Sequence, residues 1–157
     1  MFIQTWVVTG ILLGLSAFGV VQERPDFSGE WILNRQASTA SALAKGVQSG
    51  VVRIEHREPT FRYQALFVNE IGPVQSEYNL RSDGREVGII DQGLTALSAL
   101  RWENEALVLT SRVQRVDGEL RVSLRYALID SGRRLRVMEQ IRGGLRDQDN
   151  IWLFDRR

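Results

Sequence analysis

The sequence predicts an all-β domain built as an antiparallel meander, which must close into a barrel or pack on a second sheet to hide its apolar face. Apolar and polar residues alternate with a period of two along most of the chain after residue 50, the pattern of half-buried strands. Turn signals that contain glycine, which accepts positive φ, separate these runs at Asp83-Gly84, Asp117-Gly118 and Ser131-Gly132. Gly29-Glu30-Trp31 opens the expected first strand.

The N-terminal segment differs from the rest of the chain. Residues 2–21 carry no charged side chain, and Ala17-Phe18-Gly19 supplies small residues at the spacing that signal peptidase requires. We predict a signal peptide over residues 1–19 and export to the periplasm or the cell exterior. The alternative is an uncleaved membrane anchor over residues 2–21, which would be the protein's only membrane contact. Because the chain has no cysteine, it has neither a lipid-attachment cysteine nor a disulfide.

The elements follow in order along a single domain, residues 26–157. The segment after the first strand, residues 36–45, is rich in alanine and serine and ends at Gly46, so it predicts one short helix or an irregular loop. Leucines at 94, 97 and 100 have helical spacing, but the segment is short and runs into a turn, so we predict a strand. Strands are expected near residues 27–34, 51–56, 61–67, 78–80, 94–100, 107–110, 120–128, 134–141 and 151–154.

Composition excludes some classes of function. Hydrophobic residues make up 43% of the 157 residues and charged residues 25%, which is typical of a folded globular protein. The net charge is +1, from 20 basic and 19 acidic residues, so we predict no nucleic-acid partner. Asp91, Asp147 and Asp149 match no calcium loop, and no phosphate-binding glycine loop precedes a helix. We therefore predict no metal site and no cofactor.

The first strand carries a resemblance to a known family. Phe27-Ser28-Gly29-Glu30-Trp31-Ile32-Leu33-Asn34, followed by many antiparallel strands, resembles the lipocalin-like (calycin) β-barrels, especially small exported bacterial members of unassigned function. The resemblance implies an up-and-down barrel of eight to ten strands, closed at one end by Trp31 and often hollow inside. Fatty-acid-binding relatives hold a carboxylate with an Arg-x-Tyr in the last strand. Here that stretch is the apolar Trp152-Leu153-Phe154, so no carboxylate clamp is expected.

Inward-facing side chains define a candidate ligand cavity. Glu139 shares its face with Val137, and Arg112 shares one with Val108, so the two form a charged pair inside the barrel if these faces line it, or reach water at a rim if they do not. The aromatic residues of the same rows would equally build an ordinary core. The candidate lining residues are Trp31, Phe61, Tyr63, Phe67, Arg112, Leu124, Tyr126 and Glu139.

Two functions remain open on the sequence, and an enzyme that uses Glu139 or His56 is a third, less favoured one. The first is binding of a small apolar or amphipathic molecule inside the barrel by an exported protein. The alternative is an envelope structural or interaction module whose barrel is filled by side chains. His56, the only histidine, has no cysteine or second histidine to join it, so no catalytic constellation is found and we predict no enzymatic activity. The arginines at 121, 125, 134 and 136 are expected on the outer face, as solvated residues or as a basic patch.

Overall fold

The computed structural model describes residues 23–157 apart from residue 92. The predicted signal peptide therefore lies outside the described residues. Within the described residues there is no α-helix, and no helix is long and apolar enough to cross a membrane.

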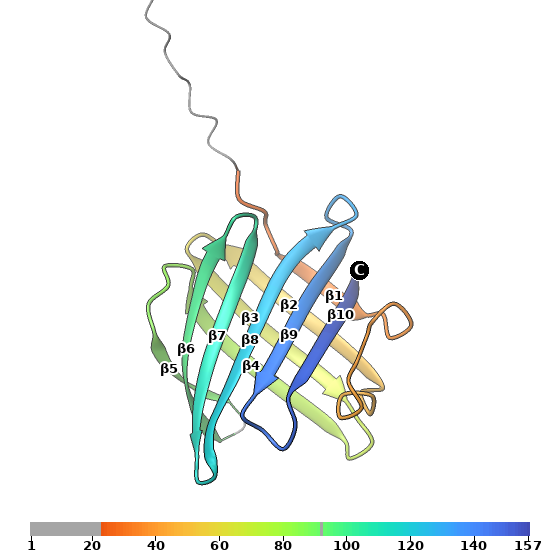
Figure 1. The fold of residues 1–157 in the computed structure, drawn as a ribbon. Coiled ribbons are helices and arrows are strands. Elements are labelled where there is room, and N and C mark those ends of the chain that lie inside the picture. Colours follow the sequence, from red (N-terminus) through yellow and green to blue (C-terminus); the bar gives the residue numbers. More distant parts are fainter. Residues whose placement is uncertain (1–22, 92) are drawn as a thin grey trace, which may run out of the picture.

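Ten antiparallel strands form one sheet that curls into a nearly closed barrel (Figure 1). Consecutive strands pair with each other, except that β4 and β5 do not, and β1 pairs with β10. This confirms the predicted all-β, lipocalin-like up-and-down barrel of eight to ten strands. The strands are β1 (Gly29–Leu33), β2 (Ser49–Arg57), β3 (Thr60–Val68), β4 (Pro73–Arg81), β5 (Val87–Asp91), β6 (Leu94–Glu103), β7 (Ala106–Arg115), β8 (Gly118–Ile129), β9 (Arg134–Arg142) and β10 (Gln148–Arg156).

The connection between β1 and β2 is an irregular loop with turns, so the second of the two expectations for residues 36–45 is correct. This loop satisfies backbone groups of β10 that the short β1 cannot reach. The Asn34 amide donates to the Leu153 carbonyl at 2.8 Å, and Thr39 forms an isolated antiparallel bridge with Ile151. The loop thus extends the edge of β1 along β10.

Trp31 closes one end of the barrel, as the resemblance implied. Its side chain is fully buried, and its Nε1 donates to the Phe27 carbonyl at 3.1 Å. The Arg156 guanidinium lies 4.2 Å from the Trp31 ring centroid and donates to the Ser28 carbonyl at 2.8 Å. Gly29 adopts a φ of 144°, which a side chain would strain. A glycine two residues before the tryptophan therefore allows the chain to enter the barrel under Arg156.

The barrel has a seam between β4 and β5. The Asp83-Gly84 signal was expected to close a hairpin, and this prediction is wrong. Asp83 instead forms a bridge with Arg101 of β6, and the Gly84 amide donates to the Leu100 carbonyl at 2.9 Å. Because these bonds hold the connection against β6, β5 continues along β6 and leaves β4 unpaired on that side.

In β3 and β8, burial of the inward row falls from the Trp31 end toward the opposite end, where the β3–β4, β7–β8 and β9–β10 turns lie (Figure 1). At the Trp31 end Phe61, Leu100 and Leu107 are fully buried. At the opposite end the inward-facing Phe67 and Val122 are only half-buried. The apolar interior is therefore sealed at one end and in contact with solvent at the other.

Candidate ligand-binding site

A small cavity of about 80 Å³ lies inside the barrel. It is bordered by inward-facing residues of β2, β3, β8, β9 and β10, and aromatic rings make up much of its wall. Five of the predicted lining residues reach it: Tyr63, Phe67, Leu124, Tyr126 and Glu139. The remaining wall comes from Val52, Leu135, Val137, Trp152 and Phe154.

Two other predicted residues belong to the packed core near the Trp31 end. Trp31 and Phe61 are fully buried and do not border the cavity. Phe61 packs against Tyr126, with their ring centroids 5.6 Å apart, so it supports a cavity residue from behind. The aromatic residues therefore divide between the two roles expected from the sequence: some fill the core, and others border the cavity.

Glu139 is the charged group of this cavity, and a polar network fixes its position. Asn150 Nδ2 donates to Glu139 Oε2 at 2.7 Å, and Trp152 Nε1 donates to the same oxygen at 2.9 Å. The Ser41 backbone amide, from the β1–β2 loop, donates in turn to Asn150 Oδ1 at 2.6 Å. Neither Asn150 nor Ser41 is among the residues predicted from the sequence. The period-two row Asn150, Trp152 and Phe154 of the last strand could have revealed the asparagine.

The predicted interior pair of Glu139 and Arg112 does not form. Arg112 lies on the outer face, where its Nη2 donates to both carboxylate oxygens of Glu86 at 2.8 and 2.7 Å. This ion pair raises the pKa of Arg112, through its hydrogen bond to Glu86 first and the charge attraction second. Val108, which shares the face of Arg112, also points outward although it is buried. Because Val108 is apolar, its face was expected to point inward, and Arg112 was wrongly placed inside with it.

The hydroxyls of Tyr126 and Tyr78 form a second polar contact in the interior, at 2.7 Å. Burial raises the pKa of Tyr126, the bond to Tyr78 opposes that rise, and the charge of Glu139 adds to it. The Tyr126 phenol is consequently neutral at physiological pH, and the interior presents it as a hydrogen-bonding group rather than a charge.

His56 belongs to a separate cluster at the Trp31 end. Its side chain is 3% exposed; its Nδ1 accepts from the Phe27 amide at 3.3 Å, and its Nε2 lies 2.8 Å from Glu58 Oε1. Glu58 also accepts from Ser82 Oγ at 2.9 Å and from Trp102 Nε1 at 2.9 Å. Burial raises the pKa of Glu58, but these hydrogen bonds outweigh it and hold the pKa below its usual value. Both histidine nitrogens are therefore engaged in closing the barrel.

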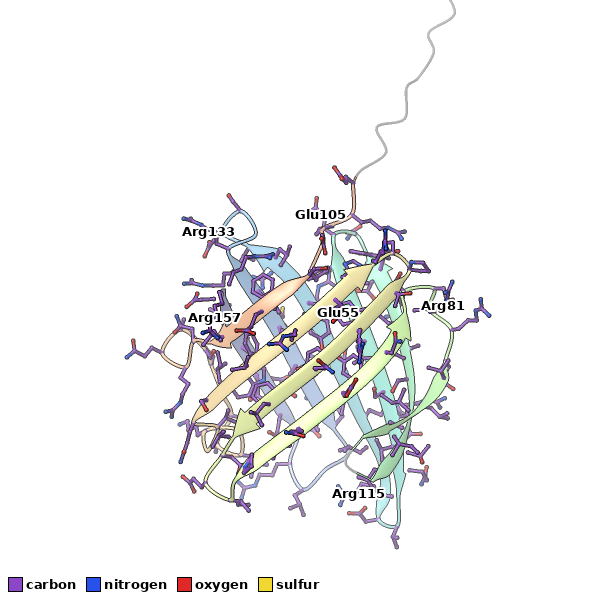
Figure 2. All side chains as sticks on the ribbon, turned by 180° about the vertical axis from the view of Figure 1, so that it is seen from behind. Glu55, Arg81, Glu105, Arg115, Arg133 and Arg157 are labelled. Carbon is purple, nitrogen blue, oxygen red and sulfur yellow. The ribbon has the colours of Figure 1, made fainter. Side chains whose placement is uncertain are left out.

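Other hollows lie on the outside. One of about 690 Å³ covers the outer face of β1–β4, where Glu30 pairs with Arg53 and with Arg157, each at 2.7 Å. Figure 2 labels Arg157 and Glu55 on this charged face. These hollows are open and bordered by solvated, mutually paired charges. Among the residues that the structure describes, no cluster of three or more histidine or acidic side chains is placed to hold a metal ion.

Comparisons with known proteins support the fold. No protein-family model and no curated protein matches the sequence. Among solved structures, secretory abundant heat soluble protein 4 from Ramazzottius varieornatus superposes with a TM-score of 0.57 at 14% identity, covering 87% of this chain and 99% of that one. Human cRBP IV gives 0.56 at 16% identity over 85% and 99% of the two chains. Zebrafish ileal bile acid-binding protein, complexed with cholic acid, gives 0.56 at 12% over 83% and 98%.

These likenesses show a shared fold and, at such low identity, no more than that. The chain has the lipocalin-like calycin barrel, as the Gly-x-Trp strand indicated. A shared barrel fold does not by itself determine a function.

Proposed function

We propose that this protein binds a small apolar or amphipathic molecule inside its barrel. The observation that supports the proposal is the cavity around Tyr63, Leu124 and Tyr126, an aromatic-walled space with one convergent polar group, Glu139. The bile acid-binding protein named above has the same fold and holds an amphipathic ligand. That likeness agrees with the proposal without identifying a ligand for this chain.

The volume of the cavity restricts how the ligand sits. Pockets that enclose a drug-sized ligand measure about 300–1,000 Å³. A cavity of about 80 Å³ corresponds to the liquid volume of about two or three water molecules. Only one end of the ligand therefore fits in this conformation. The remainder would lie against the half-buried inward rows at the end opposite Trp31, such as Phe67 and Val122, which are apolar and in contact with solvent.

We also propose that the protein is exported and acts by binding rather than catalysis. Export rests on the charge-free residues 2–21 and the small residues before Val20. N-terminal sequencing of the protein from its own cells tests it, since an intact Met1 in a membrane-embedded product would mean an anchor. A role in binding agrees with His56, whose two ring nitrogens are both occupied by structural partners.

The binding proposal is tested by filling the cavity. Leu124→Phe places a larger side chain in the space, whereas Leu66→Phe makes the same change on the outer face, where Leu66 is 40% exposed and borders the 690 Å³ hollow. Binding is followed by the fluorescence of the neutral probe N-phenyl-1-naphthylamine and its displacement by 1-dodecanol. We expect the wild type and Leu66→Phe to bind alike, and Leu124→Phe to bind at least about tenfold more weakly, with an unchanged circular dichroism spectrum.

Two results would overturn the proposal. Loss of binding in Leu66→Phe but not in Leu124→Phe would place the ligand in the outer hollow. Absence of binding of both probe and dodecanol to the delipidated wild type would mean that the interior is a packed core. The second result would favour the alternative, an interaction module with a filled barrel, which the small cavity volume makes a specific rival.

A further inference from the structure

Glu139 places a carboxyl group inside an apolar barrel, and this carboxyl group has no cationic partner among the described residues. It lies on the inward row of β9 between Val137 and Ile141, opposite Leu124 of β8 and Asn150 of β10. Among the described residues it forms no ion pair, and Arg112 is bound to Glu86 on the outer face. Among the described residues, the arginines of β8 and β9 occupy the alternate, outward positions, and Arg156 of β10 lies over the Trp31 ring at the closed end, so no positive charge lies beside Glu139.

The geometry of Glu139 leaves half of its carboxyl group available. Both protein donors, Asn150 Nδ2 and Trp152 Nε1, bind Oε2. In the described part of the chain neither of them, nor another side chain, is bonded to Oε1. Because Asn150 is itself anchored by the Ser41 amide, the network holds the carboxyl group in one orientation. A ligand donor that enters the cavity thus meets a preoriented acceptor.

The walls around this carboxyl group suit a positive charge as well. Tyr63, Tyr126 and two phenylalanines border the same cavity, beside Trp152, whose ring N–H is bonded to Glu139. The faces of such rings carry negative electrostatic potential and attract ammonium groups, most strongly where water is displaced. A carboxylate ligand would instead place a second negative charge beside the half-buried Glu139, and two like charges at this distance repel.

We propose that the ligand's inserted end is a protonated amine, so that the barrel is selective for cationic amphiphiles and against fatty-acid anions. This inference rests on the proposed binding function and specifies its ligand class. An ammonium group with its first carbon atoms matches the small volume of the cavity. It donates to Glu139 Oε1, while the hydrocarbon tail lies along the apolar rows toward the end opposite Trp31.

Three twelve-carbon ligands that differ only at the head test this selectivity: dodecylamine, 1-dodecanol and dodecanoate. At pH 7 the amine is protonated and the acid ionised. Each displaces N-phenyl-1-naphthylamine from the delipidated protein below its aggregation concentration. We expect dodecylamine to bind at least about tenfold more tightly than dodecanol, and dodecanoate to bind most weakly.

Glu139→Gln keeps the shape and an acceptor but removes the charge. It should weaken dodecylamine by about tenfold or more and reduce the discrimination against dodecanoate, while dodecanol changes little. Glu55→Gln is the matched control, because Glu55 is an exposed carboxylate on the outer face of β2 (Figure 2). It should leave all three affinities unchanged, which separates binding in the cavity from attraction of an amine to the surface.

The outcomes distinguish the two proposals. If dodecanoate binds as tightly as dodecylamine, or if Glu139→Gln and Glu55→Gln behave alike, the amine selectivity is refuted while ligand binding stands. If none of the three ligands binds the wild type, the binding proposal itself fails. Should Glu139→Gln not fold, the order of the three affinities in the wild type still decides the question.

Discussion

Truncation of Trp31 to alanine is the most direct test of how the barrel is closed. The side chain is fully buried, and burial of a large aromatic side chain covers about 150–250 Å². At about 25 cal/mol per Å² this corresponds to about 4–6 kcal/mol, close to the 3–5 kcal/mol typical of such truncations. The change also leaves the Phe27 carbonyl without its donor and removes the ring beneath Arg156. We expect a loss of about 5 kcal/mol, a large part of the stability of a typical domain.

Urea unfolding followed by circular dichroism measures this loss. With a slope of about 2 kcal/mol per M, the midpoint should fall by roughly 2.5 M, or the variant should be unfolded without urea. Arg156→Met is the matched variant, since it keeps an apolar stem over the ring and loses the guanidinium group. It should cost only about 1–2 kcal/mol. A loss below about 1 kcal/mol for Trp31→Ala would refute the argument that this ring seals the barrel.

Two further predictions concern polar groups of the interior and of the closed end. Tyr78→Phe should cost about 1–3 kcal/mol in urea unfolding, because the buried Tyr126 hydroxyl loses its bond to Tyr78, and the Tyr78→Phe/Tyr126→Phe double variant should cost less than the sum of the two single changes. Strict additivity would contradict a direct coupling. The folded-state pKa of Glu58 lies below its ordinary 4.5, so its ionised form contributes stability above that pH which is lost as the pH falls through the folded pKa. Glu58→Gln should therefore flatten the fall in the thermal midpoint as the pH drops below about 4.5, and a slope identical to that of the wild type would show that Glu58 is not responsible.

The strands were predictable where one face alternates cleanly with the other. In β8 and β9 the inward leucines and valines follow every second residue, and the register confirms their shared face. The seam was not predictable, because Asp83-Gly84 has the composition of a hairpin turn. What prevents the hairpin is a long-range bridge from Asp83 to Arg101, which local sequence does not encode.

The candidate site was also predictable where inward and outward residues alternate. Glu139 interrupts an otherwise apolar alternating row, so its inward position could be read from the sequence. Arg112 follows Ala106–Leu109, in which four consecutive residues are buried, and such a run has no alternation to show which face is inside. Val108 faces outward yet is buried beside Arg101 and Arg125, whose side chains both bond to Glu103. Long arginine stems can cover an outer apolar position in this way.

The seam between β4 and β5 also separates two strands that are consecutive in the chain. Eight of the pairings between the described strands join neighbours in sequence, and the ninth joins β1 to β10. The break in the sheet thus falls between β4 and β5, while the first strand, β1, and the last strand, β10, lie side by side. A circular permutant that joins β10 to β1 and starts at residue 87 would run through the strands in their spatial order, from β5 to β4. Its contact order would fall, since the β1–β10 pairing would become local while only the short contacts across the seam, such as the Asp83–Arg101 bridge, would become more distant in sequence, and a lower contact order favours faster folding.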